Sequence, residues 1–319
     1  MSFTRYNTED SVISSETVVR GLWSGDNYTL SSFFTSSTYT EYYLDVYDAN
    51  LTLSTSASVQ FSLQYGHVSG SGSAPINAAV PGYSPSRIVY GQYRNLVYGT
   101  ETQNFTFDGT TTSNAIWVIN VSRARYKESL LPGSLLLTLS GSAGRLHLGD
   151  DSSTTNLTRF VGENKYYNIV ATGSTSPIYG LFFPDLNTII LNANQLTGSG
   201  GTNYYVSQSR GTTVVNNHLF LYNSLVGGSN FRMNSSETIS ARYFFTRVKN
   251  SEYNYTSNPS IIDSNGNLLY TTLINNPQTY VTSVGMYNDN NELLAVAKLS
   301  KPLVKDFTKE ALIRVKLDY

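Results

Sequence analysis

The 319-residue chain contains no cysteine, which excludes disulfides and cysteine-ligated metal sites. Only 13% of its residues are charged, and its formal net charge is −1. A chain this close to neutrality has no strong field to attract nucleic acid or an anionic membrane. It also lacks an apolar run of about 20 residues, and its first residues lack the apolar stretch of a secretory signal. We therefore expect no membrane span, no secretory leader and no nucleic-acid partner.

The motifs of common catalytic sites are missing as well. The sequence has no GxSxG, no HExxH and no phosphate-binding GxxxxGK[ST]. Acid pairs such as Asp45 with Asp48 could still meet in space, because a fold rather than local spacing places glycosidase carboxylates. We expect a protein that is not an enzyme and that binds no cofactor and no metal.

The residues that are abundant predict the fold class. The chain has 25 tyrosines and 14 phenylalanines, and its many Thr, Ser, Asn and Gly residues favour strands joined by turns. This composition predicts a mainly β fold of antiparallel sheets, sandwich- or barrel-like, with a few short helices. Tyr and Asn also suit protein–protein contacts, and they suit a saccharide-binding surface equally well.

Two stretches have helical spacing of their apolar residues. Ser84 followed by Pro85 is a helix-start signal, and the pattern predicts a helix over 86–98, weakened by Gly91 in its middle. We expect Arg87 and Arg94 on this helix to be solvated or interface charges. A second helix is predicted over 212–228, ending at a glycine pair.

The remaining periodic stretches predict strands. Residues 39–49 and 57–68 alternate as an antiparallel pair, and 115–121 has the continuous apolar character of a strand buried on both faces. Three strands are predicted near the end of the chain, over 279–288, 292–304 and 310–319. Further strands are predicted over 105–109, 134–141, 166–173, 177–184 and 188–196.

We divide the chain into an N-terminal arm with the first strands (1–55), a central β-rich domain (56–240) and a C-terminal β-meander packing on it (241–319). Because 115–121 and 283–288 share a non-alternating apolar pattern, we expect both in one central sheet.

Several stretches resemble known proteins. The run VGMYNDNNELLAVAKLSKP (284–302) is similar to a run in tail-collar and baseplate proteins of tailed bacteriophages. SPSRIVYGQYRNLVYG (84–99), AIWVINVSRARYKESLLPGSLLLTLSG (115–141) and RVKNSEYNYTSNPS (247–260) resemble virion structural proteins of contractile-tailed, T4-like marine phages. The matches cover roughly 84–141 and 242–319, with a weaker one at 18–24. The resemblance implies a virion component made in the cytoplasm of a host bacterium.

Five residues are candidates for contacts with other subunits. Trp23 and Phe34 lie in a Gly/Ser-rich segment that either docks on its own domain or is exchanged with a partner. Arg123, Arg125 and Lys127 lie close together, either as a solvated turn or as a basic patch for an acidic neighbouring subunit.

Two clusters look superficially like metal sites. His147 lies near Asp150 and Asp151, but the other histidines are far away in sequence and a metal needs three or four converging ligands. The segment DSNGN (263–267) starts like a calcium loop but lacks its glycine spacing and its last acid, so an Asn-Gly turn is the simpler prediction.

Two functions fit these observations. The first is a structural subunit of a phage tail, in the baseplate, whose partners are other copies of itself and neighbouring virion proteins. The alternative is a receptor-binding fibre or collar protein that binds host saccharide. A fibrous repeat or a long heptad stretch would favour the alternative, and neither is visible.

Overall fold

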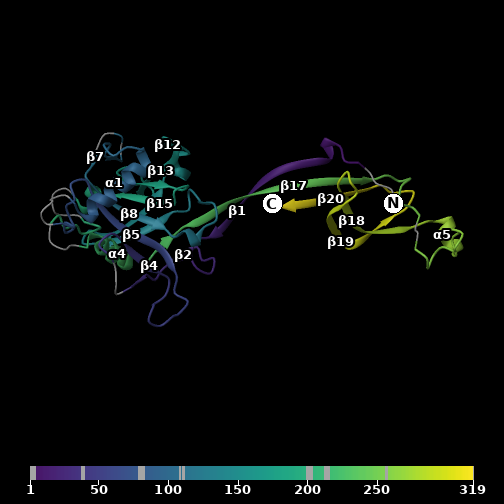
Figure 1. Ribbon diagram of the computed structural model, residues 1–319, viewed down its shortest axis with the longest axis horizontal. Helices are drawn as coiled ribbons and strands as arrows, with labels where there is room; N and C mark the ends of the chain where they lie inside the picture. Colours follow the sequence, from purple (N-terminus) through teal and green to yellow (C-terminus); the bar gives the residue numbers. More distant parts are fainter. Residues whose placement is uncertain are drawn as a thin grey trace. The chain divides into compact units, whose positions relative to one another are not determined.

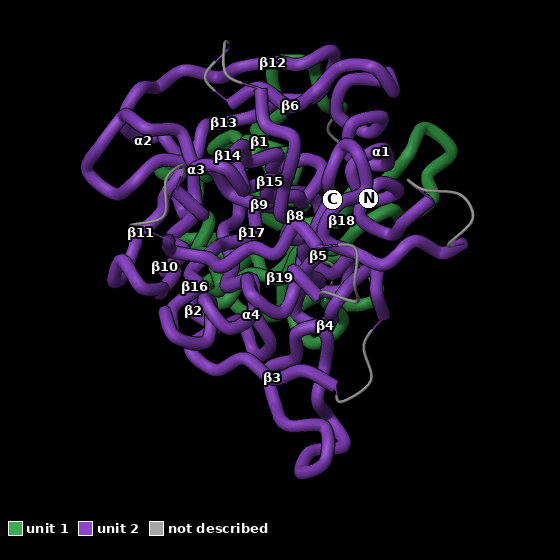
Figure 2. Tube along the Cα trace, turned by 90° about the vertical axis from the view of Figure 1, so that its left-hand side faces the viewer, with its two compact units in different colours: residues 1–16, 238–319 green, residues 17–237 purple. Residues whose placement is uncertain are grey.

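The computed structural model describes residues 5–36, 40–77, 83–107, 109, 112–198, 204–211, 216–255 and 258–318. It divides into two compact units, shown in different colours in Figure 2. Unit 2 comprises residues 17–237, and unit 1 comprises residues 1–16 and 238–319. The boundaries fall within two strands, β1 (Ser11–Gly21) and β17 (Asn234–Val248).

In its described residues, unit 2 is built on one large sheet of twelve strands that curls into a half-barrel (Figure 1). The order is β2-β16-β10-β11-β13-β14-β15-β8-β5-β4-β3, with β12 paired to β13, and the pairings are antiparallel. This confirms the predicted fold class. The strands are β2 (Thr29–Leu30), β3 (Phe34–Thr35), β4 (Leu44–Tyr47), β5 (Val59–His67), β8 (Ala115–Val121), β10 (Leu136–Gly141), β11 (Gly144–Asp150), β12 (Arg159–Val161), β13 (Asn164–Ala171), β14 (Ile178–Phe183), β15 (Thr188–Asn192) and β16 (Phe231–Arg232). The shorter strands are β6 (Phe105–Thr106) paired with β7 (Thr112–Ser113), and β9 (Ser129–Leu130) paired with β17.

Strand β8 is an interior strand of this sheet, between β15 and β5, and separates two hydrophobic cores. Trp117 and Ile119 point into one core, and Ile116 and Val118 point into the other. Successive side chains of a strand face opposite sides of the sheet, so a strand covered on both faces needs continuous apolar residues. The predicted burial of 115–121 on both faces is confirmed.

The first predicted helix is confirmed as α1 (Pro85–Tyr98), which ends at Gly99 in the left-handed region (φ 67°). Its buried side chains join the core that contains Ile116 and Val118. The Ser84 hydroxyl does not cap the helix, because it donates to the carbonyl of Gly70 instead.

The second predicted helix is confirmed from Asn217 onward. Helix α4 (Asn217–Gly228) begins at Asn217, while residues 212–215 lie outside the described residues. The left-handed residue that ends it is Ser229, not a glycine. Gly228 is needed for another reason: a side chain there would collide with the backbone of Thr138 on β10, against which α4 packs. The other helices are α2 (Ser152–Thr155), α3 (Ala193–Thr197), α5 (Thr271–Asn275) and the 3₁₀ turns η1 (Thr8–Asp10) and η2 (Arg123–Arg125).

Unit 1 contains the three predicted C-terminal strands, confirmed as β18 (Thr279–Tyr287), β19 (Leu293–Lys305) and β20 (Ala311–Asp318). β18 and β19 form a two-stranded hairpin, whereas β20 pairs with β17 in the sheet β1-β17-β20. The three strands therefore do not form a meander. The expectation that 115–121 and 283–288 share a sheet is also wrong, because β18 pairs with β19 in a separate sheet.

Candidate functional site

Trp23 lies in the core of unit 2. Its side chain is only 2% exposed, its ring packs against Phe61 and Phe231, and its indole N–H donates to the Phe231 carbonyl at 2.9 Å. Of the two possibilities left open by the sequence, this position matches a segment docked on its own domain. Phe34, on β3, is half-buried, while its neighbour Phe33 is buried against Phe61.

The structure brings the three basic residues of the predicted patch together around η2 and gives each a partner within the chain. The Arg123 guanidinium lies 4.8 Å from the centre of the Tyr126 ring. Arg125 donates to the Ser24 hydroxyl at 2.6 Å, and Lys127 pairs with Glu237 at 3.0 Å. Exposed ion pairs of this kind contribute about 1 kcal/mol or less. A role for the three cations in binding an acidic neighbour stays a prediction.

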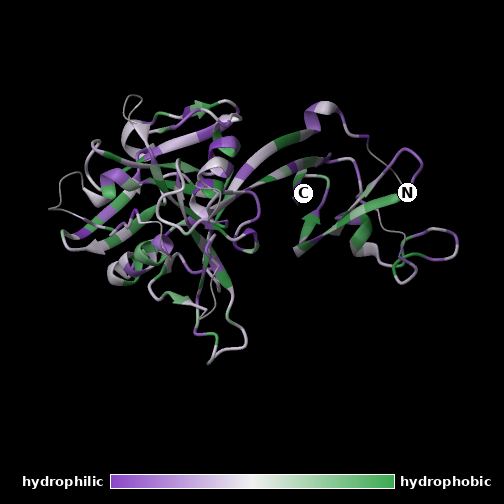
Figure 3. Cartoon of the chain, turned by 60° about the vertical axis from the view of Figure 1, so that its left-hand side comes forward, coloured by the Kyte–Doolittle hydropathy of each residue, from purple (hydrophilic) through white to green (hydrophobic). Residues whose placement is uncertain are grey.

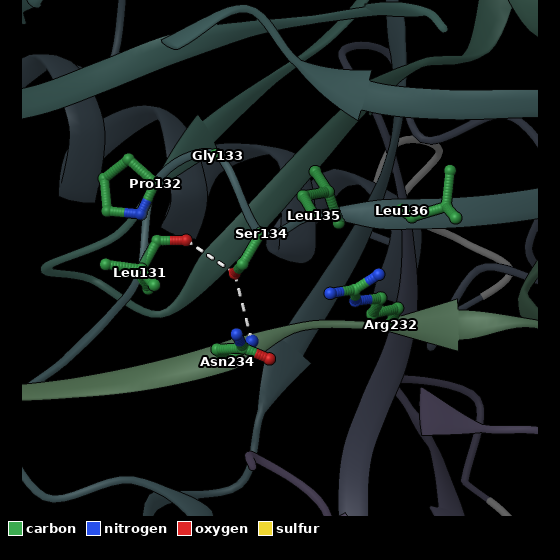
Figure 4. Close-up of a pocket in the computed structure, with 8 residues that line it drawn as sticks. All are labelled: Leu131, Pro132, Gly133, Ser134, Leu135, Leu136, Arg232 and Asn234. Atoms are coloured by element: carbon green, nitrogen blue, oxygen red, sulfur yellow. Dashed lines mark hydrogen bonds between the residues drawn. The ribbon is translucent and has the colours of Figure 1, made fainter. Parts of the chain in front are cut away.

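A small pocket of about 280 Å³ lies between the loop after β9 and the start of β17 (Figure 4). The Ser134 hydroxyl donates to the Leu131 carbonyl at 2.6 Å and accepts from the Asn234 amide at 3.0 Å, as the dashed lines show. Among the described residues that line this pocket there is no histidine or acid that could act as a base toward Ser134. The hydroxyl fixes a turn.

The acids near His147 also have structural roles. Asp150 accepts from the backbone amides of Gly133 and Leu135, and Asp151 pairs with Arg159 at 2.9 Å. His147 contacts the Thr138 hydroxyl across the β10–β11 pair. In the described part of the chain, no group of three His, Asp or Glu side chains is arranged to hold a metal ion.

The Asp263 segment forms the predicted turn. The Asp263 carboxylate accepts from the backbone amides of Asn265 and Asn267, and Gly266 has a φ of 83°. An aspartate that bonds to the backbone two residues on is the usual anchor of such a turn.

Sequence reasoning missed the most unusual surface, which belongs to unit 1. Within the described residues of this unit, the buried hydrophobic side chains are Ala241, Val248, Ala311, Ile313 and Val315. Many larger ones are exposed. They are Tyr6, Val12, Ile13, Tyr253, Tyr255, Leu269, Tyr270, Ile274, Tyr280, Tyr287, Leu293, Leu294, Val296, Phe307 and Leu312. Figure 3 colours the chain by the hydropathy of each residue. Exposed apolar surface on this scale is typical of an interaction site.

The outer edge of β18 adds an open hydrogen-bonding row to this surface. Within the described residues β18 pairs only with β19, and its nine residues include no charge and no proline. At the two register shifts of the hairpin, more residues lack a register partner on β19 than on β18, where Thr282 is skipped. β19 also carries Lys298, Lys301 and Pro302. Charges, prolines and bulges are the devices that protect an edge strand from pairing. β19 has charges, a proline and the larger irregularity, whereas β18 has neither a charge nor a proline.

A signal for this surface was present in the sequence. No charged residue occurs from residue 264 to residue 288, the stretch that contains α5 and β18. Such a run is ordinary in a core, so only the exposure of Tyr270, Ile274 and Tyr280 shows that it lies on a surface.

Comparisons with known proteins add no relative: no family model, no curated protein and no solved structure matches the chain. None of the helices in the described part of the chain combines the length and apolarity needed to cross a bilayer.

Proposed function

We propose that this chain is a structural subunit of a bacteriophage virion, a tail baseplate component that assembles through unit 1. The observation that carries the assembly role is the exposed apolar surface of unit 1, together with the unprotected edge of β18. The resemblance of residues 84–141 and 242–319 to virion structural proteins supports the phage assignment. Its partners are other copies of itself and neighbouring virion proteins.

Unit 1 gains more stabilising free energy from binding a partner than unit 2 does. A two-stranded hairpin such as β18–β19 is marginal by itself in water. Tyr280, Leu294 and Val296 are each more than 60% exposed, and burying each would contribute roughly 1–2 kcal/mol. Association costs about 4–15 kcal/mol, so a stable contact must cover several such side chains and add strand pairing along β18.

Light scattering over a concentration series tests this assignment. In one variant, Tyr280→Lys with Thr282→Lys puts two charges on β18 at exposed positions. A matched control, Leu53→Lys with Leu157→Lys, changes two exposed leucines of unit 2. We expect the unmodified chain and the control to form the same assemblies at high concentration and the β18 variant to stay monomeric. All three should unfold at similar temperatures, because exposed substitutions change stability by about 0.5 kcal/mol or less.

Two results would count against the proposal. One is a β18 variant that assembles as the unmodified chain does, and the other is an unmodified chain that stays monomeric at every concentration. A stable trimer that binds host glycans would instead favour the receptor-binding fibre or collar protein.

A further inference from the structure

An open groove of about 490 Å³ lies along the outer side of α1 in unit 2. Its lining includes Arg87, Gly91, Arg94 and Asn95 of the helix, with Tyr83 before it and Glu101 after it. None of these residues belongs to the assembly surface of unit 1. The groove is therefore a separate feature that needs its own explanation.

Gly91 is the first evidence for a ligand. A glycine inside a helix is unfavourable relative to alanine, because it loses more backbone freedom on folding. A side chain at Gly91 would meet no atom of the described residues within 4 Å, so packing does not require this glycine. Gly66 on β5 is a contrast, since a side chain there would collide with the backbone of Tyr90 on α1. What Gly91 provides is an open stretch of helix backbone in the wall of the groove.

The two arginines are the second evidence. Arg87 and Arg94 are seven residues apart, so they lie on one side of α1 at a spacing of about 10 Å, with Gly91 between them. The Arg94 guanidinium lies 5.6 Å from the centre of the Tyr90 ring and donates to Asn104 at 3.4 Å, while its Nε is buried without a hydrogen-bond partner in the described residues. Among the described residues that line the groove, two are arginines and one, Glu101, is an acid.

The other lining groups indicate the class of ligand. Tyr83 is 60% exposed and offers an aromatic ring that can lie against the C–H face of a sugar. Gln92 and Asn95 are exposed amides that can both donate to and accept from hydroxyls. Guanidinium groups bind carboxylate, sulfate or phosphate with paired hydrogen bonds. The two positions are about 10 Å apart along the helix, so two separate anionic groups of one extended ligand can each meet one arginine.

We infer that the α1 groove binds an acidic saccharide, with Arg87 and Arg94 holding two of its anionic groups and the bare backbone at Gly91 allowing the chain to lie close to the helix. This inference goes beyond the proposed assembly role and does not depend on it.

Calorimetric titration of the full chain tests the site, with oligogalacturonate as the acidic probe and a neutral glucan of similar length as its counterpart. We expect the acidic oligomer to bind and the neutral one not to. Arg94→Gln removes charge-assisted bonds and should weaken binding by roughly 10- to 100-fold. Arg145→Gln is the matched control: it removes an exposed arginine of unit 2 outside the groove and should leave binding unchanged.

Gly91→Ala separates function from stability. Alanine is the better helix former, so the melting temperature should rise by roughly 2 °C, while the new methyl group enters the groove and weakens binding at least about tenfold. A variant that is more stable and binds as well as the unmodified chain would overturn the role of Gly91. Absence of binding to the acidic oligomer, or binding that Arg94→Gln leaves intact, would overturn the site.

Equal binding of poly-glutamate would show a general anion surface and overturn the saccharide assignment. All these variants lie in unit 2, so their light-scattering masses should equal that of the unmodified chain. Saccharide binding therefore tests the groove, and the light-scattering mass tests the assembly proposal, independently of each other.

Discussion

Replacing Trp23 tests whether this residue serves the core or an interface. The side chain is 2% exposed, packs on two phenylalanine rings and donates a hydrogen bond to Phe231. Truncating a buried tryptophan to alanine costs about 3–5 kcal/mol, and the lost donor leaves the buried Phe231 carbonyl with one bond fewer. We expect Trp23→Ala to reduce the free energy of unfolding of unit 2 by about 4 kcal/mol. Trp23→Phe keeps a ring but not the donor, and should cost about 1–2 kcal/mol.

Urea unfolding followed by tryptophan fluorescence measures this loss. Trp117, the other tryptophan, is fully buried in the same core, so it reports on unit 2 when Trp23 is absent. Phe34→Ala serves as the control, because removing a half-buried ring should reduce the free energy of unfolding less than removing the Trp23 ring does. A Trp23→Ala protein that loses under about 1 kcal/mol but no longer assembles in light scattering would refute the core role and favour an exchanged arm.

Two further predictions concern buried polar side chains. Burial lowers the pKa of His218 to about 4, below the value of about 6.5 expected in the unfolded chain. The unfolded state therefore binds the proton more readily, and stability should fall by up to roughly 3 kcal/mol as pH drops from 6.5 to 4. Urea midpoints measured over this range should depend less steeply on pH in His218→Gln than in the unmodified chain. Part of the pH dependence should remain in the variant, because burial also lowers the pKa of His67. An equal pH dependence in the two proteins would contradict the assignment to His218. The fully buried Lys305 donates to the carbonyls of Asn250 and Asp306 and to the Asn254 side chain. Lys305→Met should destabilise unit 1 by roughly 2–4 kcal/mol and speed amide hydrogen exchange in β20. The fluorescence of Trp117, in unit 2, should not change. Unchanged amide exchange in β20 would count against this role of Lys305.

The features predicted correctly are those that depend on local pattern. Helix α1 combines a start signal at Ser84 with helical spacing, and β8 has the continuous apolar run that two-sided burial requires. The turn at Asp263 follows from its own side-chain bonds to the backbone. Each of these elements is specified by its own residues and by those next to it in the sequence.

The features missed depend on which partner an element finds. Apolar residues in β18 and β8 look alike in sequence, yet β8 is covered on both faces while β18 lies in an exposed hairpin. Alternation in β20 fixes which side chains share a face but does not say that β17, rather than β19, is its neighbour. Trp23 lies in a segment without periodicity, so nothing local separates core from interface.

The candidate sites also depend on partners that are distant in the sequence. The basic residues around η2 were identified from their proximity in sequence, but their partners Ser24 and Glu237 are about 100 residues away. The surface of unit 1 and the groove on α1 were both missed, because exposure is a property of the folded chain. For Gly91, the sequence showed an unfavourable helix residue, and only the structure shows the open space beside it.

Cross-linking mass spectrometry on virions, purified from lysed bacteria that encode this chain, tests the proposed tail role most directly. Lys298 and Lys301 on β19 supply exposed amines next to the proposed assembly surface, and Lys127 supplies one in unit 2. We predict that the chain is present in the particles and that Lys298 and Lys301 are cross-linked to other virion chains. Absence of the chain from the particles, or cross-links to other chains only through unit 2, would contradict the account.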